Sequence, residues 1–285
     1  MARLSRETGS SHIVVVGPKG GTGKTTTAAM LASILASSRG EIVSVLDATH
    51  QLGTLRRRLV TTTEPPTRPF SELCSRALGG ELAAEWAALA PYVDTVGSLR
   101  VLRSLSSPDA EFDLSPEAFA AGLSLIGRAS QLIVLDVGTK ANGPVMTAAL
   151  DGADALVLAT EFAYDALELT VEMASALAGE PLSYRPDPDE WTGMSDGRLA
   201  SLISNAIVVV SSGRSDDIRR RDPNLSMMLE WLGVVCGGGV VVVDSDDHLS
   251  VGGVIDQGQL EFNTVLAYTR VAASITTQLS RRDAS

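Results

Sequence analysis

Residues 17–26, with the sequence Gly-Pro-Lys-Gly-Gly-Thr-Gly-Lys-Thr-Thr, constrain this chain more than any other segment. They follow the apolar run 13–16, which is typical of a buried strand, and they lead into the helical pattern 24–38. A glycine-rich turn between a strand and a helix directs several backbone N–H groups to one point, and the helix dipole adds positive potential there. The segment therefore predicts a phosphate-binding loop.

The residues of this loop have separate predicted roles. Gly20, Gly21 and Gly23 are expected to supply unusual backbone angles and a close approach to the ligand. Lys24 is placed to contact the outer phosphates, and the Thr25 hydroxyl is placed to coordinate Mg²⁺. The complete set of predicted nucleotide contacts in the loop is Gly20, Gly21, Thr22, Gly23, Lys24, Thr25 and Thr26.

The composition narrows the fold and the partners. Hydrophobic residues make up 45% of the 285 residues and aromatic residues only 4%, so the core must be aliphatic, as in a parallel sheet covered by helices on both faces. The formal net charge of −11 opposes sequence-independent DNA binding, which depends on neutralising phosphates. Two arginine triplets, 56–58 and 219–221, leave two explanations open: solvated or helix-end charges, or a local contact with a polyanion.

Apolar runs typical of strands alternate with helical patterns along the chain. The predicted strands are residues 12–17, 42–47, 99–102, 132–136, 153–159, 202–210 and 240–243. The predicted helices are residues 24–38, 70–78, 81–89, 116–129, 164–178 and 258–281. This alternation indicates an α/β fold with a doubly wound, mostly parallel sheet and helices on both faces. We expect a flexible tail over 1–11, a single domain over 12–282, and loops at 61–70 and 180–198.

The sequence predicts a cytoplasmic protein without a transmembrane segment. The first ten residues are polar, unlike a signal peptide, and no run of about 18 apolar residues occurs. The helix 258–281 has one apolar face, which we expect to pack on the sheet rather than on a membrane, because only Arg281 and Arg282 flank it. Cys74 and Cys236 lack the spacing of a metal site, so we expect reduced thiols.

The loop also carries an additional lysine, Lys19, five residues before Lys24. The string Lys-Gly-Gly-Thr-Gly-Lys-Thr-Thr resembles the deviant Walker motif of the ParA/MinD family of ATPases, in which the position occupied here by Pro18 is variable. The resemblance covers roughly residues 12–280 and is greatest to MinD-like proteins of actinobacteria, some of which accompany type VII secretion or plasmid transfer. It implies a three-layer P-loop NTPase fold that binds ATP or ADP with Mg²⁺.

Two acidic residues at strand ends complete the implied magnesium site. Asp136 follows the run Leu-Ile-Val-Leu and resembles the Walker B acid; the alternative is a helix cap or a turn residue. Gly138 then falls where the second switch of the family senses the terminal phosphate. Asp47 resembles the first acid of the first switch and would support the hydration shell of the ion. The implied metal-binding set is Thr25, Asp47 and Asp136, and the implied catalytic set is Lys19, Lys24 and Asp47.

The second acid of the first switch, which activates the attacking water in the family, falls on Thr49 here. A threonine hydroxyl can orient a water molecule but cannot take its proton at neutral pH. His50 could serve as the base, or it could be an exposed loop histidine. The resemblance therefore implies secure nucleotide binding and, at most, slow hydrolysis of ATP to ADP and phosphate.

Two further segments resemble the base-binding parts of the family. Asn205, in Ile-Ser-Asn-Ala, resembles the strand-end asparagine that reads the adenine edge, with a turn asparagine as the alternative. The segment 243–249 with Gly252 and Gly253 resembles the loop before the last helix, in which Asp246 would contact the nucleotide. Asp244 stands where that loop usually has proline.

Lys19 points to a dimer through the same resemblance. In the family, the lysine at this position reaches across a two-fold interface to the phosphates of the partner's nucleotide. The implied function is an ATP-dependently dimerising switch for partition, positioning or secretion machinery, with an adaptor or cargo protein as a further partner. Two alternatives stay open: an ATP-binding scaffold with little hydrolysis, as Thr49 favours, and a small-molecule kinase or ligase on the same fold.

Overall fold

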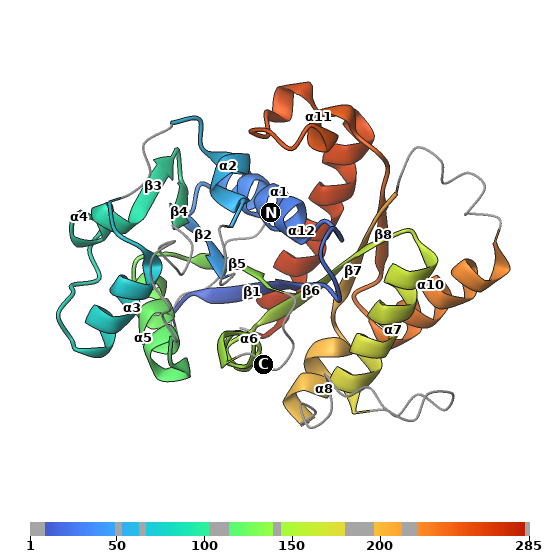
Figure 1. The fold of residues 1–285 in the computed structure, drawn as a ribbon, viewed down its shortest axis with the longest axis horizontal. Coiled ribbons are helices and arrows are strands. Elements are labelled where there is room, and N and C mark those ends of the chain that lie inside the picture. The colour runs from blue at the N-terminus through green and yellow to red at the C-terminus, as the bar shows by residue number, and fades with distance from the viewer. Residues whose placement is uncertain are drawn as a thin grey trace.

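The computed structural model describes residues 9–48, 53–62, 67–102, 114–138, 144–179, 197–212 and 222–282. These residues form an eight-stranded sheet in the order β3-β4-β2-β5-β1-β6-β7-β8, in which only the edge strand β3 runs antiparallel (Figure 1). The strands are β1 (Ser11–Val16), β2 (Val43–Ala48), β3 (Val93–Val96), β4 (Leu99–Leu102), β5 (Leu132–Val137), β6 (Ala155–Glu161), β7 (Ile207–Ser211) and β8 (Val240–Val243).

Helices cover both faces of this sheet. The helices are α1 (Lys24–Arg39), α2 (Leu55–Leu59), α3 (Phe70–Leu78), α4 (Trp86–Leu89), α5 (Pro116–Gly127), α6 (Pro144–Asp151), α7 (Tyr164–Ala178), α8 (Gly197–Ile203), α10 (Pro223–Val235), α11 (Asp247–Ser250) and α12 (Phe262–Arg282), with short 3₁₀ turns η1 (Ala90–Tyr92) and η2 (Gln257–Gln259). In Figure 1, α1, α2, α11 and α12 lie above the sheet, and α3, α5, α6, α7, α8 and α10 lie below it.

The alternation of side chains along each strand builds a separate core on each face. In β1, Ile13 and Val15 pack with α1 and α12, whereas Val14 and Val16 pack in the cluster formed with the helices of the opposite face. All four side chains are buried, and each contributes about 1.5–3 kcal/mol by leaving water. A central parallel strand therefore needs apolar residues on both of its faces, as the run 13–16 shows.

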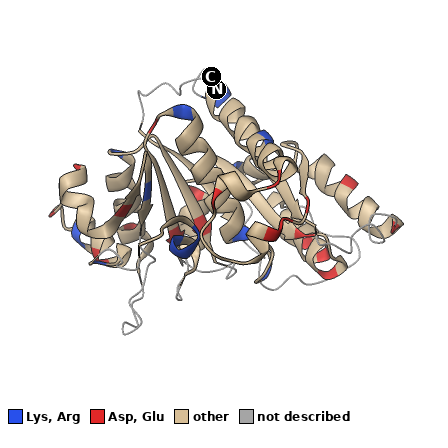
Figure 2. Cartoon of the chain, turned by 90° about the horizontal axis from the view of Figure 1, so that it is seen from above, with Lys and Arg blue, Asp and Glu red and all other residues tan. Residues whose placement is uncertain are grey.

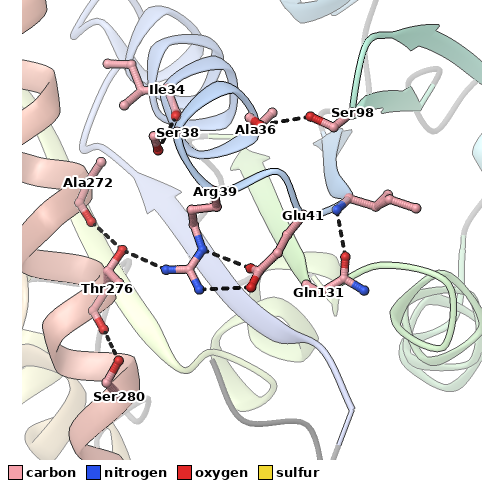
Figure 3. A network of polar contacts seen from close by, with 11 residues as sticks. Ile34, Ala36, Ser38, Arg39, Glu41, Ser98, Gln131, Ala272, Thr276 and Ser280 are labelled. Carbon is pink, nitrogen blue, oxygen red and sulfur yellow. Dashed lines mark hydrogen bonds and ion pairs between the residues drawn. The ribbon is translucent and has the colours of Figure 1, made fainter. Parts of the chain in front are cut away.

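A buried polar network fixes the carboxyl end of α1 against α12 and β5 (Figure 3). The Arg39 guanidinium donates to Glu41 Oε2 at 2.8 Å and to Thr276 Oγ1 at 3.4 Å, and both charged side chains of the pair are buried. The backbone N–H of Ile42 donates to Gln131 Oε1 at 2.6 Å. Removing one member of the buried pair would leave an uncompensated charge, so we expect a single substitution at Arg39 or Glu41 to be strongly destabilising.

The predicted α/β fold is confirmed, and the differences lie in local elements. The strand predicted at 202–210 is wrong in its first half, because residues up to Ile203 complete α8 and the strand begins at Ile207. The helix predicted at 81–89 is confined to α4, which is followed by the turn η1. The predicted loop 61–70 ends at Pro69 because Phe70 begins α3.

Some boundaries lie partly outside the described residues. Residues 63–66 and 180–196 of the two predicted loops are outside them, and Gly197 and Arg198 already belong to α8. The predicted tail reached residue 11, but Ser11 opens β1, and residues 1–8 lie outside the description. None of the described helices combines the length and the hydropathy of a membrane-spanning segment.

Basic residues are interspersed with acidic ones over the described ribbon (Figure 2). The first arginine triplet does not form a solvent-exposed surface. Arg56 forms an ion pair with Asp94, with 2.6 Å between Nε and Oδ2, and Arg58 is buried. Arg57 is exposed, and the second triplet, 219–221, lies outside the described residues. The apolar face of α12 packs on the sheet and α1 as predicted, with Val271 and Ile275 fully buried.

Candidate functional site

The phosphate loop connects β1 to α1 at the carboxyl edge of the parallel strands. Gly21 and Gly23 have φ angles of 85° and 82°, in the left-handed region that favours glycine, and Gly23 is the N-cap residue of α1. Gly20 does not have a positive φ, so the unusual backbone angle predicted for it is wrong. A Cβ at Gly20 would meet no atom of the described chain within 4 Å. The strand, the turn and the helix thus place backbone donors at the amino end of α1, as anion binding requires.

The side chain of Lys24 crosses this loop. Its Nζ donates to the carbonyl oxygen of Lys19 at 2.7 Å, and the same carbonyl accepts from Thr22 Oγ1 at 3.1 Å. Burial lowers the pKa of Lys24, and the nearby Asp136 carboxyl partly opposes that effect. The ammonium group is therefore held inside the turn, next to the amino end of α1.

Asp136 lies at the carboxyl end of β5 beside the first turn of α1. The Thr25 hydroxyl donates to Asp136 Oδ2 at 2.6 Å, while Asp136 Oδ1 is buried and has no hydrogen-bond partner in the described chain. Burial, and next the charge of Asp47, raise the pKa of this carboxyl to about 7. A buried carboxylate with an unsatisfied oxygen is costly, so this site favours a cation.

Asp47 is the direct neighbour of Asp136 across the pairing of β2 with β5. Its Oδ2 accepts from the backbone N–H of Leu55 at 3.3 Å. A Cβ at position 53 would lie 1.7 Å from that oxygen, so only glycine fits there. The Gly-x-Leu turn after the strand thus seats the Asp47 carboxylate.

The three oxygen-bearing side chains of Thr25, Asp47 and Asp136 fit a small divalent cation. Mg²⁺ prefers oxygen ligands, and it is usually held by one or two carboxylates, waters and the phosphates of a nucleotide. Within the described ranges, no group of three or more histidine, cysteine, aspartate or glutamate side chains could hold a metal by itself. The arrangement therefore suits an ion that arrives with a nucleotide better than a site built from protein ligands alone.

Two further predicted site residues, Gly138 and Thr26, lie beside the phosphate loop. Gly138 directly follows β5 and is half-buried at the same edge of the sheet, and Thr26 lies in the first turn of α1. Thr49 and His50, on which the prediction of slow hydrolysis rests, lie outside the described residues.

Asn205 does not lie at this edge. It precedes β7, and its amide donates to the carbonyl oxygen of Ser201 at 2.9 Å, while its own backbone carbonyl accepts from Gln278 at 2.8 Å. The five residues of β7 span about 16 Å, which separates Asn205 from the carboxyl edge. The adenine contact predicted for Asn205 is therefore wrong, because the apolar residues before the asparagine belong to α8 rather than to the strand.

Asp246 lies at the carboxyl edge, but its carboxylate is used within the chain. Oδ1 accepts from Leu249 N at 3.2 Å and Oδ2 from Glu261 N at 2.9 Å. Burial disfavours the charged form, but these N–H donors outweigh it and lower the pKa of Asp246. Asp246 thus shapes the segment between β8 and α12, and the structure gives it no free carboxylate oxygen for the direct nucleotide contact predicted from the sequence.

Lys19 projects from the loop toward the beginning of α7, where its Nζ forms an ion pair with Asp165. The Asp165 side chain is 68% exposed, and its hydrogen bond with Lys19 lowers its pKa. The pair joins two residues 146 positions apart, and no feature of the sequence signals it. Lys19 is thus held by its own chain in this structure.

Comparison with known proteins identifies the family. The model of the CobQ/CobB/MinD/ParA nucleotide binding domain matches residues 13–278. The chain belongs to this family. No curated protein matches the sequence significantly.

Solved structures share the fold at low sequence identity. The cell division ATPase MinD of Pyrococcus furiosus superposes with a TM-score of 0.64 at 19% identity, covering 94% of this chain and 99% of that one. A ParA family ATPase from Chlorobium tepidum gives a TM-score of 0.62 at 15% identity and covers 96% of both chains. The septum site-determining protein MinD of Pyrococcus horikoshii, solved with Mg-ADP, gives 0.62 at 16% identity, covering 93% of this chain and 96% of that one. The nucleotide-binding fold of the family therefore extends over nearly the whole chain.

Proposed function

We propose that this protein binds Mg²⁺ and ATP and acts as a nucleotide-dependent dimerising switch. The observation that carries the proposal is the arrangement of Thr25, Asp47 and Asp136 beside the phosphate loop, with a buried Asp136 oxygen that has no partner in the described chain. Family membership supports the nucleotide, and the solved relatives include MinD with Mg-ADP and a variant of Cyanothece McdA in complex with ATP.

Each side chain has a defined part in holding the nucleotide. The ammonium of Lys24 would exchange the Lys19 carbonyl for phosphate oxygens, which are stronger acceptors because they are charged. The Thr25 hydroxyl and the two carboxylates would hold Mg²⁺, which supplies positive charge against the outer phosphates. The ion would favour the ionised form of Asp136, whose pKa is about 7 in its absence.

Calorimetric titration with ATP, with and without Mg²⁺, tests this part. We expect Lys24→Met to abolish binding and Lys19→Ala to retain one nucleotide per chain. Wild-type protein that binds ATP equally well in EDTA would contradict the metal site.

The ion pair of Lys19 supports the dimerisation step. In this structure Lys19 is bound to Asp165, at the exposed start of α7. Exposed ion pairs contribute little free energy, so the triphosphate of a second subunit can displace Asp165 as the partner of Lys19. We therefore infer that the chain is monomeric with Lys19 bound in cis, and that ATP draws two chains together with Lys19 bound in trans.

An ATP-binding scaffold with little turnover is the second candidate, because Thr49 replaces the acid that activates water in the family. Phosphate release in the presence of Mg²⁺ separates the two candidates: a switch that resets by hydrolysis is expected to release phosphate slowly, whereas a scaffold stays at background. For either candidate, release should become faster when Thr49→Asp restores the acid. If that substitution leaves release at background, the missing acid is not what limits turnover.

The partner is proposed to be an adaptor or cargo protein that binds the outer helices, in the cytoplasm. One solved relative is the MinC:MinD cell division complex of Aquifex aeolicus, in which a MinD protein binds another protein. The sequence resemblance to actinobacterial proteins favours partition, positioning or secretion machinery as the setting. The net charge of −11 disfavours DNA as a general partner.

A further inference from the structure

Arg58 is a buried arginine in α2, the short helix that follows the turn holding Asp47. Only 5% of its surface is exposed, although its neighbour Arg57 in the same helix is exposed. Arginine is seldom buried without a specific function for its donors. Within the described residues, Arg58 contributes no ligand to the proposed magnesium site and no donor to the phosphate loop's backbone, so its burial has another cause.

The Arg58 guanidinium joins three segments of the chain. Its Nη2 donates to Thr26 Oγ1 at 3.2 Å and to the carbonyl oxygen of Leu249 at 3.0 Å, and Nη1 donates to the carbonyl oxygen of Gly253 at 3.2 Å. The backbone carbonyl of Arg58 also accepts from Ile255 N at 2.8 Å. A single residue after the first switch thus fastens the segment 249–255 to the first turn of α1.

These partners of the guanidinium are neutral. Among the ion pairs between described residues, none includes Arg58, and burial lowers the pKa of its guanidinium. The charge is therefore held inside the protein by one hydroxyl and two backbone carbonyls. A lysine could not reproduce this pattern, because only the planar fork of arginine reaches several acceptors in fixed directions.

The segment 249–255 lies on the side of the loop where the nucleoside of a bound nucleotide belongs. Asp47 and Asp136 lie on β2 and β5, to one side of β1, so the outer phosphates with their metal belong on that side. The nucleoside must then extend away from the metal. The segment after β8 comes from the opposite half of the sheet, at the same carboxyl edge. It is the part of the described chain that meets Thr26 through Arg58.

We propose that Arg58 is a positioning residue that holds the segment 249–255 against the phosphate loop and thereby sets how tightly the nucleoside half of the nucleotide is retained. The inference rests on the proposed binding of ATP. Because Arg58 comes from α2, immediately after the turn that seats Asp47, it links the metal side of the site to the nucleoside side. Rearrangement of the first switch would then change the retention of the nucleoside.

The test compares a nucleotide with its phosphate chain alone. Calorimetry measures the Kd of ADP and of inorganic tripolyphosphate, each with Mg²⁺. The proteins are the wild type, Arg58→Met and Arg58→Lys. The control is Arg57→Met, which removes the same charge from the same helix. We expect Arg58→Met to weaken ADP binding about tenfold or more while tripolyphosphate changes less than twofold. Arg58→Lys should recover part of the ADP affinity, and Arg57→Met should match the wild type.

Two results would overturn the proposal: an unchanged Kd for ADP in Arg58→Met, or an equal loss for ADP and tripolyphosphate, which would place the effect at the phosphate loop. A wild type that binds neither ligand would instead refute the proposed function. If the variants do not fold, hydrogen exchange on the wild type decides. ADP should slow exchange at the Ile255 amide, and tripolyphosphate should not; equal protection by both ligands would reject the role of Arg58.

Discussion

Replacing Asp136 by asparagine should change the pH dependence of stability in the absence of nucleotide and Mg²⁺. The pKa of this carboxyl is raised from its ordinary value of 3.8 to about 7, so the folded chain keeps a proton that the unfolded chain loses. Stability from this group is therefore fully present below pH 4 and is lost as the pH rises to about 7. At 1.36 kcal/mol for each pKa unit, the full loss is on the order of 4 kcal/mol.

The change in the free energy of unfolding between two pH values is easier to interpret than the free energy of unfolding at one pH. Between pH 5 and pH 8 the wild type should lose roughly 2–3 kcal/mol that Asp136→Asn does not lose, because only part of the transition lies above pH 5. Asparagine still accepts from the Thr25 hydroxyl. Any penalty for its buried amide, about 1–3 kcal/mol, is the same at both pH values and cancels.

Urea denaturation of both proteins in EDTA at pH 5 and pH 8 measures this difference. Titrations of groups distant from Asp136 cancel as well, whereas those of Asp47 and Lys24, whose charges act on Asp136, are altered by the substitution and belong to the measured difference. A stability difference between the variant and the wild type that stays constant from pH 5 to pH 8 would refute the raised pKa and, with it, the argument that this site favours a cation. The variant should also gain nothing from Mg-ADP, which stabilises the wild type by mass action.

Three further predictions concern single residues. Gly53→Ala should destabilise the chain by about 1–3 kcal/mol in denaturant titration, because its Cβ would lie 1.7 Å from Asp47 Oδ2; an unchanged midpoint would contradict that contact. Asp165→Asn should lower the ATP concentration at which half of the protein is dimeric in light scattering, because it releases Lys19; a shift to higher concentration would show that Asp165 supports the dimer instead. Asn205→Ala should leave the Kd of ADP unchanged in calorimetry, because Asn205 lies at the opposite edge of the sheet. A larger Kd for the variant would show that Asn205 belongs to the nucleotide site.

The α/β architecture was predictable because fully apolar runs such as residues 132–135 are buried on both faces of a parallel sheet. The phosphate loop was predictable for a different reason. Its glycines and lysines are adjacent in the sequence, so local chemistry determines its geometry, apart from the ordinary backbone angle of Gly20.

Contacts between distant segments were not predictable in the same way. Nothing near Arg58 in the sequence indicates that its side chain turns inward to Thr26 and Leu249, since an arginine triplet usually faces solvent. Asn205 was misplaced because the apolar residues of α8 run into those of β7, and a short apolar run does not distinguish a helix from a strand.

Light scattering on the purified protein with Mg²⁺ measures whether ATP pairs two chains through Lys19. We expect a monomer with ADP and a dimer with a non-hydrolysable ATP analogue. We also expect Lys19→Ala to remain monomeric with the analogue while still binding one nucleotide per chain. A wild type whose mass does not change between ADP and the ATP analogue, or a Lys19→Ala variant that dimerises as fully as the wild type, would contradict this pairing.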